Sequence, residues 1–88
     1  MKIKDGFVLE EVGNSYLAVA VGERAKSFSG LVRMNETGAF LWNLMLESDV
    51  TREELLEKVL AAYEVSKEQA FADIVAFEEK LRAGGIIE

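Results

Sequence analysis

The sequence predicts an α+β fold in which a three-stranded antiparallel sheet is followed by three helices, parts similar to those of small winged helix-turn-helix domains. Two apolar, β-rich segments flank a turn signal, a third short segment of the same kind follows, and three helix-start signals mark the second half of the chain. A run of strands followed by a run of helices is typical of α+β proteins. The length of 88 residues fits one domain, which we expect to span residues 1–88.

The first two predicted strands form a hairpin. Residues 6–12, GFVLEEV, alternate imperfectly between the two faces of a strand, and residues 16–21, YLAVAV, are rich in β-branched and aromatic side chains. The intervening Gly-Asn-Ser is a turn signal, because Gly13 is free to adopt a positive φ. We therefore expect an antiparallel pair joined by a tight turn.

The third predicted strand covers residues 31–34 and follows a polar connection over residues 22–30. Successive side chains of a strand point to opposite faces. The two faces carry Leu31 with Arg33 and Val32 with Met34. If the strands follow sequence order in the sheet, this strand lies at an edge, where its outer N–H and C=O groups are open to an extended peptide.

Each predicted helix has its own start signal. Asn35 suits an N-cap. Residues 51–54, Thr-Arg-Glu-Glu, fit a capping box, and residues 66–69, Ser-Lys-Glu-Gln, fit a second one. The Gly-Gly pair at 84–85 ends the last helix, with a glycine in the left-handed conformation.

The last predicted helix carries more apolar surface than one packing contact needs. Its core stripe recurs at helical spacing and comprises Ala70, Ile74, Phe77 and Leu81. Phe71 and Val75 lie about 100° further round the helix, beside Glu78 and Arg82. These side chains either pack on the first predicted helix or line a groove for a partner, and the residues alone leave both interpretations open.

The first predicted helix, which begins after Asn35, is apolar on almost every side. A helix of this kind is normally central and covered all round. Complete cover is hard to arrange in a domain of this size. We therefore expect either that this helix is the hub of the core or that part of its surface, such as Trp42, belongs to a partner.

The composition argues against catalysis and metal binding. The chain has no His and no Cys, which removes the commonest general base, the commonest metal ligand and the thiolate nucleophile. The sequence also has no calcium-binding loop and no glycine-rich phosphate loop. We expect no enzyme activity, no cofactor and no metal.

The charge argues against nucleic acid as a partner. Sixteen acidic residues against ten basic ones give a net charge of −6, whereas nucleic-acid affinity comes largely from Lys and Arg at phosphates. No apolar run reaches the roughly 20 residues that span a bilayer, and no signal peptide opens the chain. We therefore expect a cytoplasmic protein.

Several segments, taken in order, resemble the PqqD family, whose members are small partner proteins named for coenzyme PQQ synthesis protein D. The segments are MNETGAFLW at 34–42 and TREELLEKVLAAYEVSKEQAFADIVAFEEKLRAGGIIE at 51–88. The matching positions are Asn35, Thr37, Gly38, Ala39, Trp42, Thr51, Glu54, Leu55, Tyr63, Asp73, Ile74, Phe77, Leu81, Gly85 and Ile86. The N-terminal hairpin also fits, so the resemblance covers essentially the whole chain.

The resemblance implies a RiPP recognition element, a winged-helix-like domain that binds the leader segment of a ribosomally made precursor peptide. The leader would add as an extra strand to the third strand and lie against the last helix. The domain would present it to a modifying enzyme, often a radical S-adenosylmethionine (SAM) protein, without being the catalyst itself. Carried over by position, the peptide-binding residues would be Leu31, Val32, Arg33 and Met34 on the strand and Phe71, Ile74, Val75, Glu78 and Arg82 on the helix.

Two other functions are open to the chain. One is a structural or regulatory protein–protein module, such as a homodimer joined through the apolar first helix. The other is a small winged-helix DNA binder, which the net charge disfavours. Sedimentation at several concentrations separates the homodimer from a monomeric leader binder.

Overall fold

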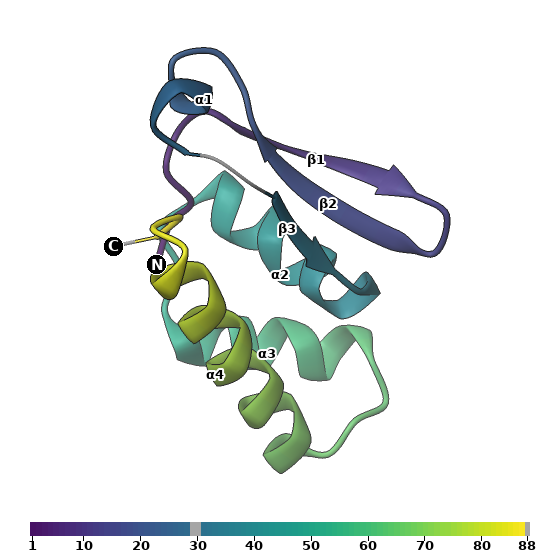
Figure 1. The fold of residues 1–88 in the computed structure, drawn as a ribbon. Coiled ribbons are helices and arrows are strands. Elements are labelled where there is room, and N and C mark those ends of the chain that lie inside the picture. Colours follow the sequence, from purple (N-terminus) through teal and green to yellow (C-terminus); the bar gives the residue numbers. More distant parts are fainter. Residues whose placement is uncertain (29–30, 88) are drawn as a thin grey trace. The chain divides into compact units, whose positions relative to one another are not determined.

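The computed structural model describes residues 1–28 and 31–87. These residues form three strands and four helices, which Figure 1 labels in chain order: β1 (Phe7–Val12), β2 (Ser15–Ala20), α1 (Arg24–Ser27), β3 (Leu31–Met34), α2 (Glu36–Glu47), α3 (Arg52–Ala62) and α4 (Lys67–Ala83). The predicted α+β fold is confirmed, since a three-stranded antiparallel sheet precedes three long helices. The chain divides into two compact units, Lys4–Phe40 and Met1–Ile3 with Leu41–Glu88, and the boundary falls within α2.

The first unit contains the sheet, in which β2 lies between β1 and β3. The antiparallel register places Val8, Val19 and Leu31 in one cross-strand row, on the face opposite to Phe7, Ala18 and Met34. Phe7, Ala18 and Met34 are buried, whereas Val8 and Leu31 are exposed. The sheet therefore has one packed apolar face and a second face that also carries apolar side chains.

The predicted hairpin turn is confirmed. Residues 13 and 14 join β1 to β2, and the register pairs Val12 with Ser15. Gly13 has φ +62°, and a Cβ at this position would meet nothing within 4 Å. The turn therefore requires glycine for its backbone conformation and not for lack of space.

The connection predicted over residues 22–30 contains a one-turn helix, α1, which the sequence pattern does not reveal. Figure 1 shows α1 at the end of the sheet where β1 begins. The Arg24 Nε donates a hydrogen bond of 2.8 Å to the Asp5 carbonyl, which ties this turn to the chain just before β1. A Cβ on Gly6 would lie 2.5 Å from the Cβ of Arg24, so the close approach requires glycine there. Residues 29 and 30 lie outside the described part of the chain.

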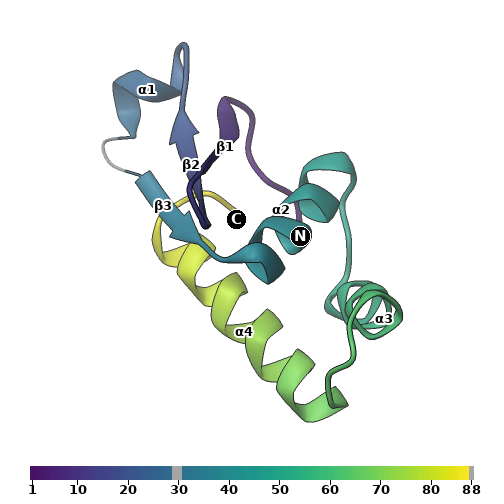
Figure 2. The same ribbon diagram turned by 90° about the vertical axis from the view of Figure 1, so that its right-hand side faces the viewer.

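In the second unit, α3 and α4 pack side by side, as Figures 1 and 2 both show. The capping box at the start of α3 is confirmed: the Thr51 hydroxyl accepts from the Glu54 N–H, and the Glu54 carboxylate accepts from the Thr51 N–H. The second predicted box is only half formed. The Ser66 hydroxyl accepts from the Gln69 N–H, but the side-chain amide of Gln69 donates to Asp73 at 2.8 Å, one turn further along α4.

Two backbone hydrogen bonds close the end of α4. The Ile86 N–H donates to the Leu81 carbonyl and the Gly85 N–H donates to the Arg82 carbonyl, which together form a Schellman motif. Gly85 has φ +75°, so the predicted left-handed helix end is confirmed. Leu81 and Ile86 are both fully buried, and they are the positions that usually make the apolar contact of this motif.

Helix α2 contributes mainly to the core. The Asn35 side chain accepts from the Gly38 N–H at 2.9 Å, as predicted for an N-cap. Leu41, Trp42 and Met45 are buried within the chain itself, whereas Leu46 is exposed. Of the two roles expected for this helix, the hub of the core therefore accounts for most of its apolar surface. No helix in the described part of the chain is long and apolar enough to cross a membrane.

Candidate functional site

The outer edge of β3 is the first candidate surface. Over residues 1–28 and 31–87, β3 pairs with β2 on one side and with no strand on the other. In an antiparallel ladder, alternate residues direct both N–H and C=O away from the neighbouring strand. β3 contains no proline and only one charged side chain, Arg33, so little blocks a further strand from pairing there.

The four β3 side chains that were predicted as peptide-binding residues fall on two faces. Leu31 is 54% exposed, and Arg33 is also exposed. Val32 is half-buried and Met34 is buried in the core. The backbone of all four residues belongs to the edge strand, but only Leu31 and Arg33 present most of their side chains at the surface.

The other edge of the sheet is β1, which differs from β3 in charge. β1 carries Glu10 and Glu11. Charged side chains on an edge strand are a common means of discouraging further pairing. Of the two edges, β3 is therefore the better template for an added peptide strand.

Helix α4 is the second candidate surface. Ala70, Ile74, Phe77 and Leu81 are buried, so the predicted core stripe is confirmed. Phe71 is 44% exposed and Val75 is half-buried. The question that the sequence left open is therefore answered in part, because Phe71 retains a large exposed surface and the wide apolar arc of α4 is not wholly used in packing.

Glu78 is the only buried charged residue in the described part of the chain, and it is 5% exposed. Both of its carboxylate oxygens accept hydrogen bonds from arginines. Oε1 accepts from Arg52 Nε at 3.1 Å and from Arg52 Nη2 at 2.9 Å, and Oε2 accepts from Arg82 Nη1 at 2.7 Å. Charge-assisted bonds of this kind offset the desolvation of a buried carboxylate.

The two arginines hold the pKa of Glu78 below its usual range. The hydrogen bond from Arg82 is the largest cause, burial opposes it, and the hydrogen bond and charge of Arg52 act in the same direction as Arg82. Glu78 is therefore ionised at neutral pH. The predicted peptide-binding residue Glu78 is directed at its two arginines, so it is less accessible to a partner than they are.

Arg52 is a candidate residue that sequence reasoning alone does not find. Its guanidinium carbon lies 5.7 Å from the centroid of the Phe71 ring, within cation–π range. Arg52 stands 26 positions before Glu78, so no helical spacing links the two, and the residue reads as one of several solvated charges at the start of α3. Arg52, Phe71, Glu78 and Arg82 together form what we call the arginine cluster.

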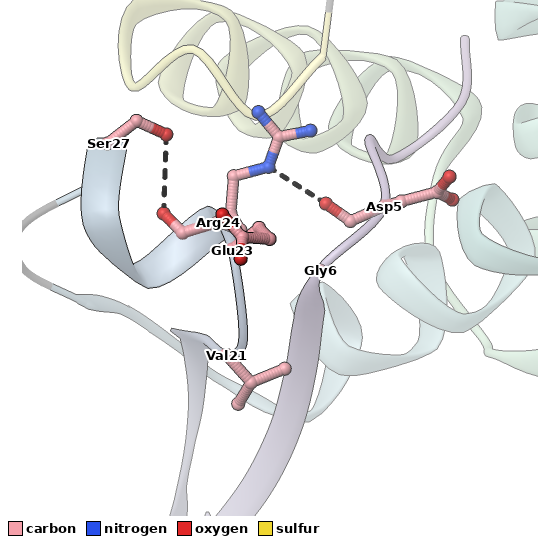
Figure 3. A pocket seen from close by; sticks show the side chains of 6 residues that line it. All are labelled: Asp5, Gly6, Val21, Glu23, Arg24 and Ser27. Carbon is pink, nitrogen blue, oxygen red and sulfur yellow. Dashed lines mark hydrogen bonds between the residues drawn. The ribbon is translucent and has the colours of Figure 1, made fainter.

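The described residues also line two open hollows, one of them next to Arg52 and Glu78. One, of about 400 Å³, has a lining that includes Asp49, Arg52, Glu53 and Glu78 and is therefore mixed in charge. The other, of about 360 Å³, lies beside α1; Figure 3 shows Arg24 on its wall, bonded to the Asp5 carbonyl. The Arg24 guanidinium also lies 5.7 Å from the Phe7 ring, so its contacts are those of a structural support.

No group of three or more metal-ligating side chains occurs among residues 1–28 and 31–87. The surfaces described above present backbone amides, apolar side chains and guanidinium groups. Backbone amides on an edge strand together with apolar side chains are the groups that bind an extended peptide.

Comparison with known proteins gives one family and one fold. The model of the family described as coenzyme PQQ synthesis protein D (PqqD) matches residues 8–87. A solved structure described as "TbiB1 in Complex with the TbiA(beta) Leader Peptide" is similar with a TM-score of 0.76, covering 100% of this chain and 95% of that chain. At 20% sequence identity, this likeness concerns the fold. No curated protein matches the chain.

Proposed function

Because the chain belongs to the PqqD family, we propose that it binds the leader segment of a ribosomally made precursor peptide and presents it to a modifying enzyme. The observation that carries this proposal is the outer edge of β3, which no strand in the described part of the chain occupies. The similar TbiB1 structure is a complex with a leader peptide, which supports the same class of ligand for this chain.

The leader binds β3 as a fourth strand, with backbone hydrogen bonds supplying sequence-independent affinity. The added strand extends the cross-strand rows of the sheet. One row continues from Val8, Val19 and Leu31 on the exposed face, and the neighbouring row continues from Leu9, Ala18 and Val32 on the opposite face. Leader side chains that continue these rows meet apolar neighbours, so the bound segment is itself apolar at those positions.

The leader also uses α4. Phe71 and Val75 supply apolar contact area, and Ile74 supports them from the core. Glu78 contributes through the arginines it holds, including Arg82. The protein is a carrier and not the catalyst. The modification is carried out by a separate enzyme, for which a radical SAM protein is our candidate.

Amide NMR titration of the labelled full chain tests the proposal. The probe is a synthetic leader from a short precursor reading frame beside the gene. We expect shifts at residues 31–34 and 71–82, with smaller changes along β1, which serves as an internal reference. Shifts confined to other residues, or no shifts at all, would refute the binding surface.

A pair of variants on α4 sharpens the test. Val75→Asp places a charge in the half-buried apolar surface beside Phe71 and is expected to weaken binding about tenfold or more, equivalent to about 1.4 kcal/mol. Ala76→Asp adds the same charge to an exposed neighbouring position and is the matched control. An equal loss of peptide affinity in both variants would mean that an added negative charge weakens binding at either position. The Val75 surface would then have no special part in binding.

A further inference from the structure

The arginine cluster has an arrangement that packing alone does not require. A buried carboxylate with two guanidinium partners is often no more stabilising than apolar side chains of similar volume, because desolvating the charges costs several kcal/mol. Glu78 nevertheless lies buried with both oxygens bonded by arginines from two different helices. The result is that Arg52 and Arg82 are both fixed at the surface of the second unit.

The arginines remain accessible although Glu78 is buried. The side chains of Arg52 and Arg82 are 41% and 48% exposed, whereas that of Glu78 is 7% exposed. A guanidinium has five N–H donors. Arg52 uses its Nε–H and one Nη2–H on Glu78, and the other donors of its planar fork are suited to a second carboxylate.

The charge of the cluster differs from that of the chain. Two arginines and one glutamate give it a net charge of +1, in a protein with a net charge of −6. The nearby hollow contains the carboxylates of Asp49 and Glu53, which disfavour an anion there. The guanidinium carbon of Arg52 lies 5.7 Å from the centroid of the Phe71 ring, so an anion bound by the remaining N–H donors of Arg52 has an apolar side chain close by.

We infer that Arg52, with Arg82 beside it and Glu78 as the positioning residue, binds an acidic side chain of the leader while the Phe71 ring contacts an adjacent apolar one. This inference rests on the proposed function and specifies its substrate class: a peptide in which Asp or Glu stands next to apolar residues. Arg52 fixes which residue of the peptide lies on α4, because one carboxylate accepts from two of its three remaining donors.

Two short peptides test this inference without knowledge of the natural leader. The probes are acetyl-Ser-Val-Ile-Glu-Leu-Ser-amide and its counterpart with Gln in place of Glu, titrated into the labelled full chain at low salt. The Glu peptide should bind about three- to fivefold more tightly, the range of a partly exposed ion pair. Its binding should shift the Arg52 Nε–H and Phe71 amide signals, and the preference should shrink in about 0.5 M salt, a condition that screens surface charges.

Arg52→Gln should abolish the preference for the Glu peptide. Lys58→Gln, which removes one positive charge from an exposed position on the same helix, should leave the preference intact. Should Arg52→Gln fail to fold, Arg52→Lys keeps the charge without the planar fork and should retain only part of the preference. A full preference in either folded Arg52 variant would overturn the inference.

The Glu78→Gln variant tests whether Glu78 acts by positioning the two arginines or only through the net charge of the cluster. The substitution raises the net charge of the cluster, yet it removes the anion that holds both arginines, so we expect the preference to fall. A larger preference would show that only net charge matters and would overturn the role of Glu78.

If both peptides bind equally to the unmodified chain with shifts at residues 31–34, the inference fails while the proposed function stands. If neither peptide binds, the inference is contradicted, and the titration with the natural leader decides the proposed function.

Discussion

Two phenylalanines on α4 differ in how far they are buried. Phe77 is 7% exposed and belongs to the core stripe, whereas Phe71 is 44% exposed and lies beneath the Arg52 guanidinium. The spacing of apolar residues predicts that Phe77 is buried. It does not predict whether Phe71 is buried, because a side chain about 100° from the stripe is covered or exposed according to what packs next to it.

Truncating each of the two phenylalanines to alanine gives a matched comparison of their contributions to the free energy of unfolding. Phe77→Ala should lower the free energy of unfolding by about 3–5 kcal/mol, because truncation of a buried aromatic ring leaves a cavity. Phe71→Ala should lower it by about 1 kcal/mol or less, since the ring is partly in water in the folded state. Urea denaturation measures both values, and similar losses in the two variants would contradict the assignment of faces.

Glu78 makes stability depend on pH. Its folded-state pKa is lowered, so its contribution is fully present above the unfolded-state pKa of about 4.3 and is lost as the pH falls through the lower folded-state pKa. Glu78→Gln should therefore be less stable than the unmodified chain at pH 7, and the difference should narrow as the pH falls below about 4. Thermal melting across this range checks the prediction, and a difference independent of pH would contradict it.

The sequence predicts the regular elements well because most of their signals are local. Asn35, Thr51 and Ser66 each begin a helix as expected, and each hydroxyl or amide oxygen acts within three residues. Helix α1 was missed because its four residues have no room for a helical repeat. The Arg24 bond that supports it reaches back to Asp5, a contact between residues 19 positions apart that no local pattern encodes.

The candidate site was predicted less completely, for the same reason. The open edge follows from three strands in sequence order, and the surplus apolar arc follows from the spacing in α4. The pairing of Arg52 with Glu78 depends on how α3 packs against α4. Such contacts between elements become visible only in the structure. They show Glu78 bonded to two arginines, and its part in peptide binding stays a prediction.

The glycine pair at the end of α4 gives a prediction at the level of the element. Gly85 has a positive φ with open space around it, so Gly85→Ala should cost about 1 kcal/mol through backbone strain alone. Gly84 has φ −82°, and an added Cβ would make only ordinary contacts of 3.5 Å or more. Gly84→Ala should therefore be neutral or stabilise the protein by about 0.5 kcal/mol. Chemical denaturation that ranks the two variants in the reverse order would contradict the Schellman ending.

At the scale of the whole molecule, we propose that the chain is one domain, as its length predicts. Helix α2 runs through the boundary between the two compact units, so unfolding of either unit removes packing partners from the same helix. We expect one cooperative transition, in which the fluorescence of Trp42 and the far-UV circular dichroism change together. Two separated transitions would instead indicate two independently stable parts.

Trp42 also tests self-association through α2. It is the only tryptophan and is completely buried within a single chain. Its emission should therefore be blue-shifted and independent of protein concentration. A red shift on dilution in native buffer would mean that a second chain covers Trp42, which would favour the homodimer considered as the alternative function.

The shortness of β3 has a consequence for how long a bound peptide stays on the protein. The strand spans four residues, and only alternate ones direct their amides outward, so a guest strand gains about four backbone hydrogen bonds there. So few bonds favour a short residence time for any peptide that pairs with this edge. A longer edge would hold each guest more tightly and would also recruit unrelated chains.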